Sequence, residues 1–265
     1  MKVLPLNSLF FYLATLLAWG GEAAKWTQVW ADEFNGPANS APDPSKWTFD
    51  LGASGWGNHE VEDYTRDNAC LDGHGHLVIR AIRSAANKYT SGRIKTQGRY
   101  EVQYGRIEAR IKIPRGQGMW PAFWMLGGDM AAVGWPNSGE IDVMENIGKE
   151  PSIVHGTVHG PGYSGAKGIA AAHTLETGAQ FHDYGVEWSA DSVEFFVDRK
   201  PYAKVTHASL PAGAVWAFDK PFFLLLNLAI GGDWPGNPDS TTRFPQSMLV
   251  DWVRVWKRQS VFSAR

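Results

Sequence analysis

The sequence predicts an all-β protein in which two antiparallel sheets pack face to face, as a sandwich or jelly roll. Several short segments alternate between apolar and polar residues, and no stretch of twelve residues shows a convincing helical stripe. The 29 glycines and 15 prolines among 265 residues are compatible with many short strands joined by turns. No linker, charge block or repeat divides the chain, so one domain over residues 25–257 is the simplest interpretation.

The N-terminus has the pattern of a secretory signal peptide over residues 1–23. Lys2 supplies a positive charge, residues 9–19 form an apolar core, and Gly21-Glu22-Ala23 offers small residues for cleavage. The apolar run is too short to span a bilayer comfortably, although a retained anchor is the alternative. We expect an exported protein, extracellular or periplasmic, with no membrane contact after cleavage and a short tail at residues 258–265.

Two segments, residues 106–113 and residues 193–197, predict half-buried strands. Val193, Phe195 and Val197 alternate with other residues, and the following Asp198–Pro201 segment is typical of a hairpin turn. In the earlier segment, apolar and charged residues alternate in one run: Ile107, Ala109, Ile111 and Ile113 against Arg106, Glu108, Arg110 and Lys112.

Two later segments complete the strand pattern. Residues 222–226 form a continuous apolar run after Pro221, which fits a strand buried on both faces. Near the C-terminus, Leu249, Val253 and Val255 are predicted to share one face of a strand.

The segment Gly139–Asn146 carries three acids in a pattern that suggests chemistry. Glu140 and Asp142 are two residues apart, so both point to one face of a strand. Glu145 has the wrong parity for that face. A β-bulge at Val143-Met144 would return it to the same face, and bulges recur beside active sites.

Distance favours a particular use of Glu140 and Glu145. At about 3.3 Å per residue their Cα atoms would lie about 13 Å apart, and inward-leaning side chains would leave about 5 Å between the carboxyls. Retaining glycosidases use that separation, whereas inverting enzymes need a wider one. One acid must then be ionised and the other protonated. A solvated acidic face or a calcium site is the alternative explanation of the three acids.

Composition points to a neutral ligand. The formal net charge of −2 gives no basic field of the kind that nucleic-acid binding needs, and it disfavours a polyanionic partner. Thirteen tryptophans is a high count; most are expected to pack in the core and between the sheets, and the remainder could stack on sugar rings. Cys70 is the only cysteine, so no intrachain disulfide can form, and we expect it to be a buried small apolar residue.

The acidic segment resembles the active-site strand of family-16 glycoside hydrolases, in the bulged form typical of laminarinases. The resemblance runs in register from Trp30 to Trp256, and other segments are similar to that family as well: residues 104–110, 118–126, 134–136, 155–160, 231–236 and 251–255. It implies a β-jelly roll with a substrate cleft across a concave sheet.

The resemblance also implies roles for single residues. Glu140 matches the nucleophile, Asp142 its assisting acid and Glu145 the acid/base. The positions that match glucose subsites are Asn58, Arg93, Trp120, Trp124, Trp135 and His159.

Two of these subsite positions have competing interpretations. Trp124, beside Phe123 and Met125, could instead be a core residue. His159 shares a strand face with His155, but no Cys, Asp or Glu in the sequence pattern completes a zinc set, so a hydrogen-bonding role is expected.

The resemblance implies a structural calcium ion held by the Glu33 carbonyl, Gly75 and Asp251. The position of Asp251 independently indicates a bound cation. Asp251 is predicted to share the apolar face of Leu249 and Val253, where a carboxylate needs a partner such as a hard cation. A pair with an arginine is the alternative. The reaction itself is expected to need no cofactor.

The activity implied is that of an endo-β-1,3-glucanase acting on β-glucan, with laminarin as the expected substrate and a monomer as the expected state. The segments Gly134-Trp135-Pro136 and Gly232–Gly236 resemble laminarinases more than lichenases or galactan-cutting relatives. A glucan-recognition protein, a transglycosylase and an enzyme for another β-linked polysaccharide are the alternatives.

Overall fold

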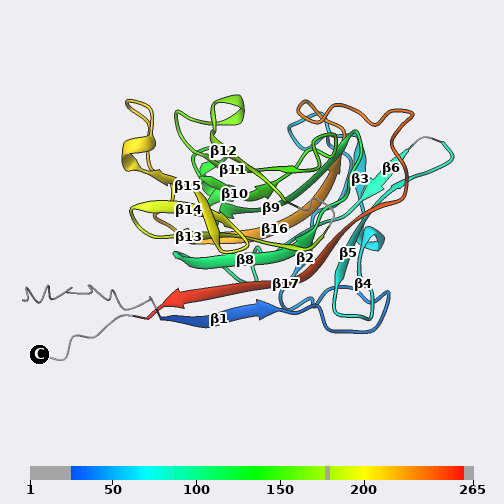
Figure 1. The fold of residues 1–265 in the computed structure, drawn as a ribbon, viewed down its shortest axis with the longest axis horizontal. Helices are drawn as coiled ribbons and strands as arrows, with labels where there is room; N and C mark the ends of the chain where they lie inside the picture. The colour runs from blue at the N-terminus through cyan, green and yellow to red at the C-terminus, as the bar shows by residue number, and fades with distance from the viewer. Residues whose placement is uncertain (1–24, 87, 177–179, 260–265) are drawn as a thin grey trace, which may run out of the picture.

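A computed structural model describes residues 25–86, 88–176 and 180–259 as two stacked antiparallel-rich sheets (Figure 1). The predicted signal peptide lies outside the described residues, as do residues 260–265 of the predicted tail. Gln259 donates its backbone N–H to the Lys25 carbonyl at 2.8 Å, so the two ends of the described domain meet. None of the helices in the described ranges is long and apolar enough to cross a membrane.

The larger sheet has ten strands in the described residues, in the order β15-β14-β13-β8-β17-β5-β6-β3, with β1 paired to β17 and β4 to β5. All its pairs are antiparallel except β3 with β6. Its strands are β1 (Trp26–Asp32), β3 (Glu62–Tyr64), β4 (Ala69–Leu71), β5 (Leu77–Arg83), β6 (Tyr89–Ser91), β8 (Gly105–Lys112), β13 (His182–Trp188), β14 (Ser192–Val197), β15 (Lys200–Thr206) and β17 (Gln246–Arg258).

Within the described part of the chain, the smaller sheet has seven strands in the order β12-β11-β10-β9-β16-β7-β2. Its strands are β2 (Thr48–Phe49), β7 (Arg93–Lys95), β9 (Met119–Gly127), β10 (Glu140–Glu145), β11 (Ile153–His159), β12 (Ile169–Thr174) and β16 (Phe222–Ile230). Helical segments are short: α1 (Met130–Val133), η1 (Arg66–Asn68), η2 (Gly165–Lys167) and η3 (His207–Ser209).

The core lies between the two sheets and confirms two of the predicted strands. Ile107, Ala109 and Ile111 of β8 are fully buried, while Arg106 and Arg110 of the same strand remain partly exposed. Every residue of β16 is buried, because this strand lies between β9 and β7 with the core on one face and cleft residues on the other.

The predicted hairpin turn joins β14 to β15. Asp198 and Arg199 adopt positive φ values of 49° and 64°, and Val197 pairs with Lys200 across the turn. Two central residues in the left-handed region match the twist of the flanking strands, which is why short hairpins use this turn.

The face assignment predicted near the C-terminus is wrong for Leu249 and Asp251. Between Val250 and Trp252 the register of β17 against β8 shifts, which leaves Asp251 as an extra residue. The core-facing residues are therefore Met248, Val250, Val253 and Val255, and Leu249 is only half-buried. A bulge reverses the alternation on one side of it, and the apolar pattern alone did not locate this bulge.

Candidate active site

The bulge predicted in the acidic segment is present in β10. Asp142 pairs with Trp124 of β9 while Met144 pairs with Phe123, so Val143 is the extra residue. Val143 and Met144 are both buried, at 2% and 0% exposure, on the core side. The side chain of Glu145 consequently lines the same cleft as those of Glu140 and Asp142.

Two indole N–H groups hold the outer glutamates. Trp135 Nε1 donates to Glu140 Oε2 at 2.6 Å, and Trp120 Nε1 donates to Glu145 Oε1 at 2.9 Å. Indole nitrogens can only donate, so each bond favours the ionised form of the carboxyl that accepts it. Trp135 is 44% exposed, so its ring is also available to a ligand.

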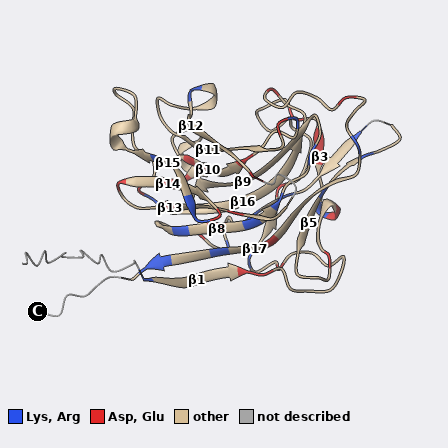
Figure 2. Cartoon of the chain, viewed as in Figure 1, with Lys and Arg blue, Asp and Glu red and all other residues tan. Residues whose placement is uncertain are grey.

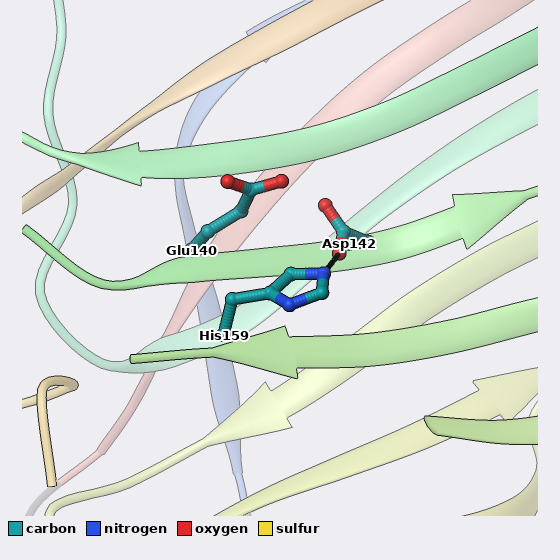
Figure 3. A group of neighbouring side chains, drawn as sticks. All are labelled: Glu140, Asp142 and His159. Carbon is teal, nitrogen blue, oxygen red and sulfur yellow. Dashed lines mark ion pairs between the residues drawn. The ribbon is translucent and has the colours of Figure 1, made fainter. Parts of the chain in front are cut away.

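The central acid is paired with a histidine from the neighbouring strand β11. His159 Nε2 lies 3.1 Å from Asp142 Oδ2, and Figure 3 shows Glu140 on the other side of Asp142. The contact is an ion-pair distance, and Asp142 Oδ2 has no hydrogen-bond partner among the described residues, so the hydrogen-bonding role expected for His159 stays a prediction. The sequence pattern offered no Cys, Asp or Glu to complete a metal set with this histidine, whereas in the structure one ligand atom each from Glu140, Asp142 and His159 lies within 4.8 Å of the others. Strand pairing brings them together, which sequence spacing does not reveal.

Burial dominates the acid–base properties of the three acids. It raises the pKa of Glu140 and of Asp142 well above the usual range, with the neighbouring acid raising each further. Burial, and then the charge of Glu140, raise the pKa of Glu145 to about 8. Burial lowers the pKa of His159, so its imidazole is neutral at neutral pH. Clustered buried acids share protons, so one can attack while another donates.

The cleft that holds these acids has a volume of about 620 Å³ and lies on the face of the seven-stranded sheet turned away from the core. Five of the six predicted subsite residues line it, namely Asn58, Arg93, Trp120, Trp124 and Trp135. The sixth, His159, borders it through Asp142 and lies 6.1 Å from the Trp135 ring.

Trp124 is a cleft residue and not a core residue. Its Nε1 donates to Asn227 Oδ1 at 2.7 Å, and its ring lies 4.8 Å from the Arg93 guanidinium. Arg93 is held between this ring and that of Trp56, which lies 4.6 Å away, and it donates to Asp50 at 2.9 Å. The cation is thereby fixed in the cleft wall.

Several cleft residues were missed from the sequence. Trp56 lines the cleft from a glycine-rich loop, and that setting was the available signal. Trp234 lies beside the cleft, in the family-like segment 231–236, and packs edge-on against the cleft residue Trp120 at 5.6 Å and against His155 at 5.0 Å. Glu60 lines the cleft as well, and nothing in the sequence pattern distinguished it from a surface acid.

The predicted metal residues lie on or beside strands of the ten-stranded sheet, whereas the three acids lie on β10 of the seven-stranded sheet. Both oxygens of Glu33 accept from Arg254 at 2.8 Å, and Asp251 lies 3.1 Å from Arg110. Gly75 occupies the turn between β4 and β5, with φ of 90°.

An arginine pair, the alternative partner predicted for Asp251, is present in this arrangement. Calcium takes six to eight oxygens, whereas the one carboxylate predicted as a ligand is already in an ion pair. The argument from an apolar face is also removed by the β17 bulge. Calcium at these residues stays a prediction, and no step of the chemistry depends on it.

Comparison with known proteins identifies the family. The model of glycosyl hydrolases family 16 matches residues 61–254. A beta-glucanase of Rhodothermus marinus is 39% identical over 252 residues, covering 89% of this chain and 87% of that protein. The clotting factor G alpha subunit of Tachypleus tridentatus is 40% identical over 246 residues, covering 90% of this chain but 35% of that protein.

Among solved structures, the endo-beta-1,3-glucanase of Pyrococcus furiosus aligns with a TM-score of 0.84 and 46% identity, covering 90% of this chain and 97% of that one. The fold, the acidic strand and these matches agree. The chain belongs to family 16 of the glycosyl hydrolases.

Proposed function

We propose that the protein is a retaining endo-glycosidase that hydrolyses internal β-1,3 linkages of glucans such as laminarin. The observation that carries the proposal is the bulged strand β10, which places Glu140 and Glu145 in one cleft with Asp142 between them. The printed names of the beta-glucanase and endo-beta-1,3-glucanase relatives support the substrate class.

The reaction has two steps. In the first, a Glu140 carboxylate oxygen attacks the anomeric carbon, the glycosidic C–O bond breaks, and Glu145 gives its proton to the departing oxygen. In the second, water attacks the anomeric carbon and gives a proton to Glu145, and the bond to Glu140 breaks. Asp142 can share a hydrogen bond with Glu140, and the Nε2 atom of the neutral His159 lies 3.1 Å from the Asp142 carboxyl.

The rest of the cleft suits a neutral polysaccharide. The rings of Trp120, Trp124 and Trp135 offer faces on which the C–H side of a sugar can stack. Arg93 and Lys95 both pair with Asp50, at 2.9 and 2.6 Å, which offsets much of the local positive charge. Polar groups held in this way provide hydrogen bonds to hydroxyls without calling for an anionic ligand.

The test is release of reducing sugar from laminarin, lichenan, agarose and carrageenan. We expect the wild type to cleave laminarin best, Glu140→Ser to bind laminarin without cleaving it, and Glu150→Gln, which alters an exposed acid, to behave as wild type. Binding without cleavage by the wild type would make the protein a glucan-recognition protein. Preferred cleavage of agarose or carrageenan would overturn the substrate assignment.

We also propose export after signal cleavage and a monomeric state. The supporting observation for export is the charge and apolar pattern of residues 1–23. Export is tested by N-terminal sequencing of protein recovered from the medium or periplasm, and we expect a new terminus near Lys25. The monomeric state is tested by light scattering.

A further inference from the structure

A second pair of acids lies beside the cleft, where the loop of residues 52–61 enters β3. Glu60 lines the cleft, whereas Glu62 is fully buried. Glu62 Oε2 accepts the backbone N–H of Ile230 at 2.6 Å, while Oε1 finds no donor among the described residues. Glu60 and Glu62 are two residues apart, so their side chains point to the same side of an extended chain, and the charge of Glu60 raises the pKa of Glu62. A fully buried carboxyl beside a second, half-buried one is costly unless a proton lies between them.

The hydrogen bonds around Glu60 indicate which of the two acids is ionised. Its Oε1 accepts from Asn58 Nδ2 at 3.0 Å, and its Oε2 accepts from the Tyr64 hydroxyl at 3.1 Å. Donors on both oxygens favour a carboxylate. The proton of the pair therefore belongs on Glu62.

A directed chain of hydrogen bonds connects this pair to the cleft floor. Trp124 can only donate, so the oxygen of Asn227 faces it and the Asn227 amide nitrogen donates to the Tyr64 oxygen, at 3.0 Å. The Tyr64 proton must then point to Glu60. The orientation of the Trp124 ring thus depends on an acceptor at Glu60.

The same junction ties two cleft loops together through the backbone. The Val61 N–H donates to the Ile230 carbonyl and the Asp233 N–H donates to the Asn58 carbonyl, both at 2.9 Å. A displaced Glu60 would disturb the loop that follows β16, which carries Trp234.

We propose that Glu62 holds a proton at neutral pH and acts as a positioning residue, donating a hydrogen bond to Glu60 and so fixing Glu60 and Trp124 as a subsite for a glucose unit of the substrate. Naming glucose as the ligand rests on the proposed function; the proton on Glu62 does not.

The surrounding groups define the expected pH range. Burial, and then the charge of Glu60, raise the pKa of Glu62 to about 9. Arg93 of β7 is a nearby cation, and β16 faces Glu62 with an uncharged backbone N–H. Burial and the two acids keep the pKa of Tyr64 well above its usual value, so Tyr64 remains a donor. Above about pH 9, Glu62 becomes a second negative charge against Glu60.

Glutamine is a neutral replacement of the same shape. In Glu62→Gln the amide oxygen can accept from Ile230 and the amide nitrogen can donate to Glu60. Binding of laminarihexaose is measured by calorimetry in a Glu140→Ser background, which prevents turnover. With Glu62 present we expect affinity to fall by up to about tenfold per pH unit above about pH 9. With Glu62→Gln we expect equal affinity at neutral pH and no such fall, while Asp63→Asn, an exposed neighbour, keeps the fall.

A second measurement needs no ligand. The folded protein holds the Glu62 proton up to about pH 9, against an ordinary value of 4.5, so the stability that Glu62 contributes is lost as pH rises between these values. The unfolding temperature of Glu62→Gln should therefore rise relative to wild type across that range, because all other acids titrate alike in both proteins.

Three results would overturn the proposal: parallel unfolding curves, an equal alkaline loss of binding in both proteins, or weak binding by folded Glu62→Gln at neutral pH. If laminarihexaose binds neither protein while the unfolding curves diverge, the glucan function fails and the proton on Glu62 stands.

Discussion

Single residues decide which buried carboxyl in the cleft carries a proton. Burial and the charge of Glu140 raise the pKa of Glu145 to about 8, so this residue is an acid at neutral pH. Glu140 accepts the short bond from Trp135, which favours its ionised form against the effect of burial. Both indole bonds lower the pKa of the glutamate that accepts them, against the larger opposite effect of burial.

Glu145→Gln should abolish cleavage of laminarin but retain part of the activity on an aryl β-glucoside with an activated leaving group. An amide cannot donate the proton that a sugar alcohol needs, and such catalysis contributes about a hundredfold to ten-thousandfold. The measurement is kcat/KM on both substrates. Equal losses on both would contradict the acid role.

Trp120→Phe should move the alkaline limb of the pH profile to higher pH. Glu145 must be protonated to act, so activity is present below its pKa and lost above it. The Trp120 bond lowers that pKa, and its removal raises it. The control is Trp135→Phe, which removes the donor to Glu140 and should raise the acidic limb instead. An alkaline limb of kcat/KM that stays in place or moves to lower pH in Trp120→Phe would count against this account.

Among the strands, the bulge in β10 lets a segment with an odd number of steps between two acids pair with neighbouring segments that have an even number of steps. From Asp142 to Glu145 the strand takes three steps, while β9 and β11 each take two between the paired residues. Val143 is the extra residue, and its side chain is buried in the core beside that of Met144.

Deletion of Val143 should therefore leave a folded protein with some activity. The shortened strand alternates regularly, so Glu140, Asp142 and Glu145 still face the cleft. The loss of one buried valine costs about 2 kcal/mol. As the matched control, deletion of both Val143 and Met144 leaves three steps between Glu140 and Glu145, which turns Glu145 toward the core and should abolish activity. Circular dichroism and laminarin hydrolysis measure both variants; equal inactivity of two folded variants would show that parity is not the deciding factor.

Strands whose pattern is unbroken could be predicted from the sequence, and bulged strands only where chemistry marked the bulge. The alternation in β8 and the apolar run in β16 identified those strands and their buried faces. The bulge in β10 was predicted because three acids needed one face. That in β17 was not, because Asp251 gave no comparable reason for one, and half of the face assignment there was reversed.

At the scale of the whole molecule, several ion pairs lie on the ten-stranded sheet. Figure 2 shows basic residues along β8 and β17, where Arg110 pairs with Asp183 and Asp251, and Arg254 with Glu33. Hydrogen bonding to Arg254 lowers the pKa of Glu33. Partly exposed pairs of this kind contribute little each, typically about 0–1 kcal/mol.

If arginines are the partners of these acids, calcium should not matter to stability. We expect the unfolding temperature to be unchanged by a chelator or by added calcium, and Asp251→Asn to cost no more than about 1 kcal/mol. Scanning calorimetry provides both values. A calcium-dependent rise that disappears in Asp251→Asn would instead establish the cation site predicted from the family resemblance.

The candidate site was predictable where residues act in a local pattern and not where they meet through the fold. The three acids lie within six residues, and the family resemblance indicated Trp120, Trp124 and Arg93. The partnership of Asp142 with His159 and the Glu60–Glu62 pair against Ile230 depend on strand pairing across the sheets. Residues that far apart in sequence carry no joint signal in a single chain.

The most direct test of the central claim is proton NMR of laminarin digestion at its earliest time points. If Glu140 and Glu145 act as nucleophile and acid from one bulged strand, the first product formed carries the β-anomer, and the α-anomer appears only later by mutarotation. Initial formation of the α-anomer would contradict the double displacement on which the account rests.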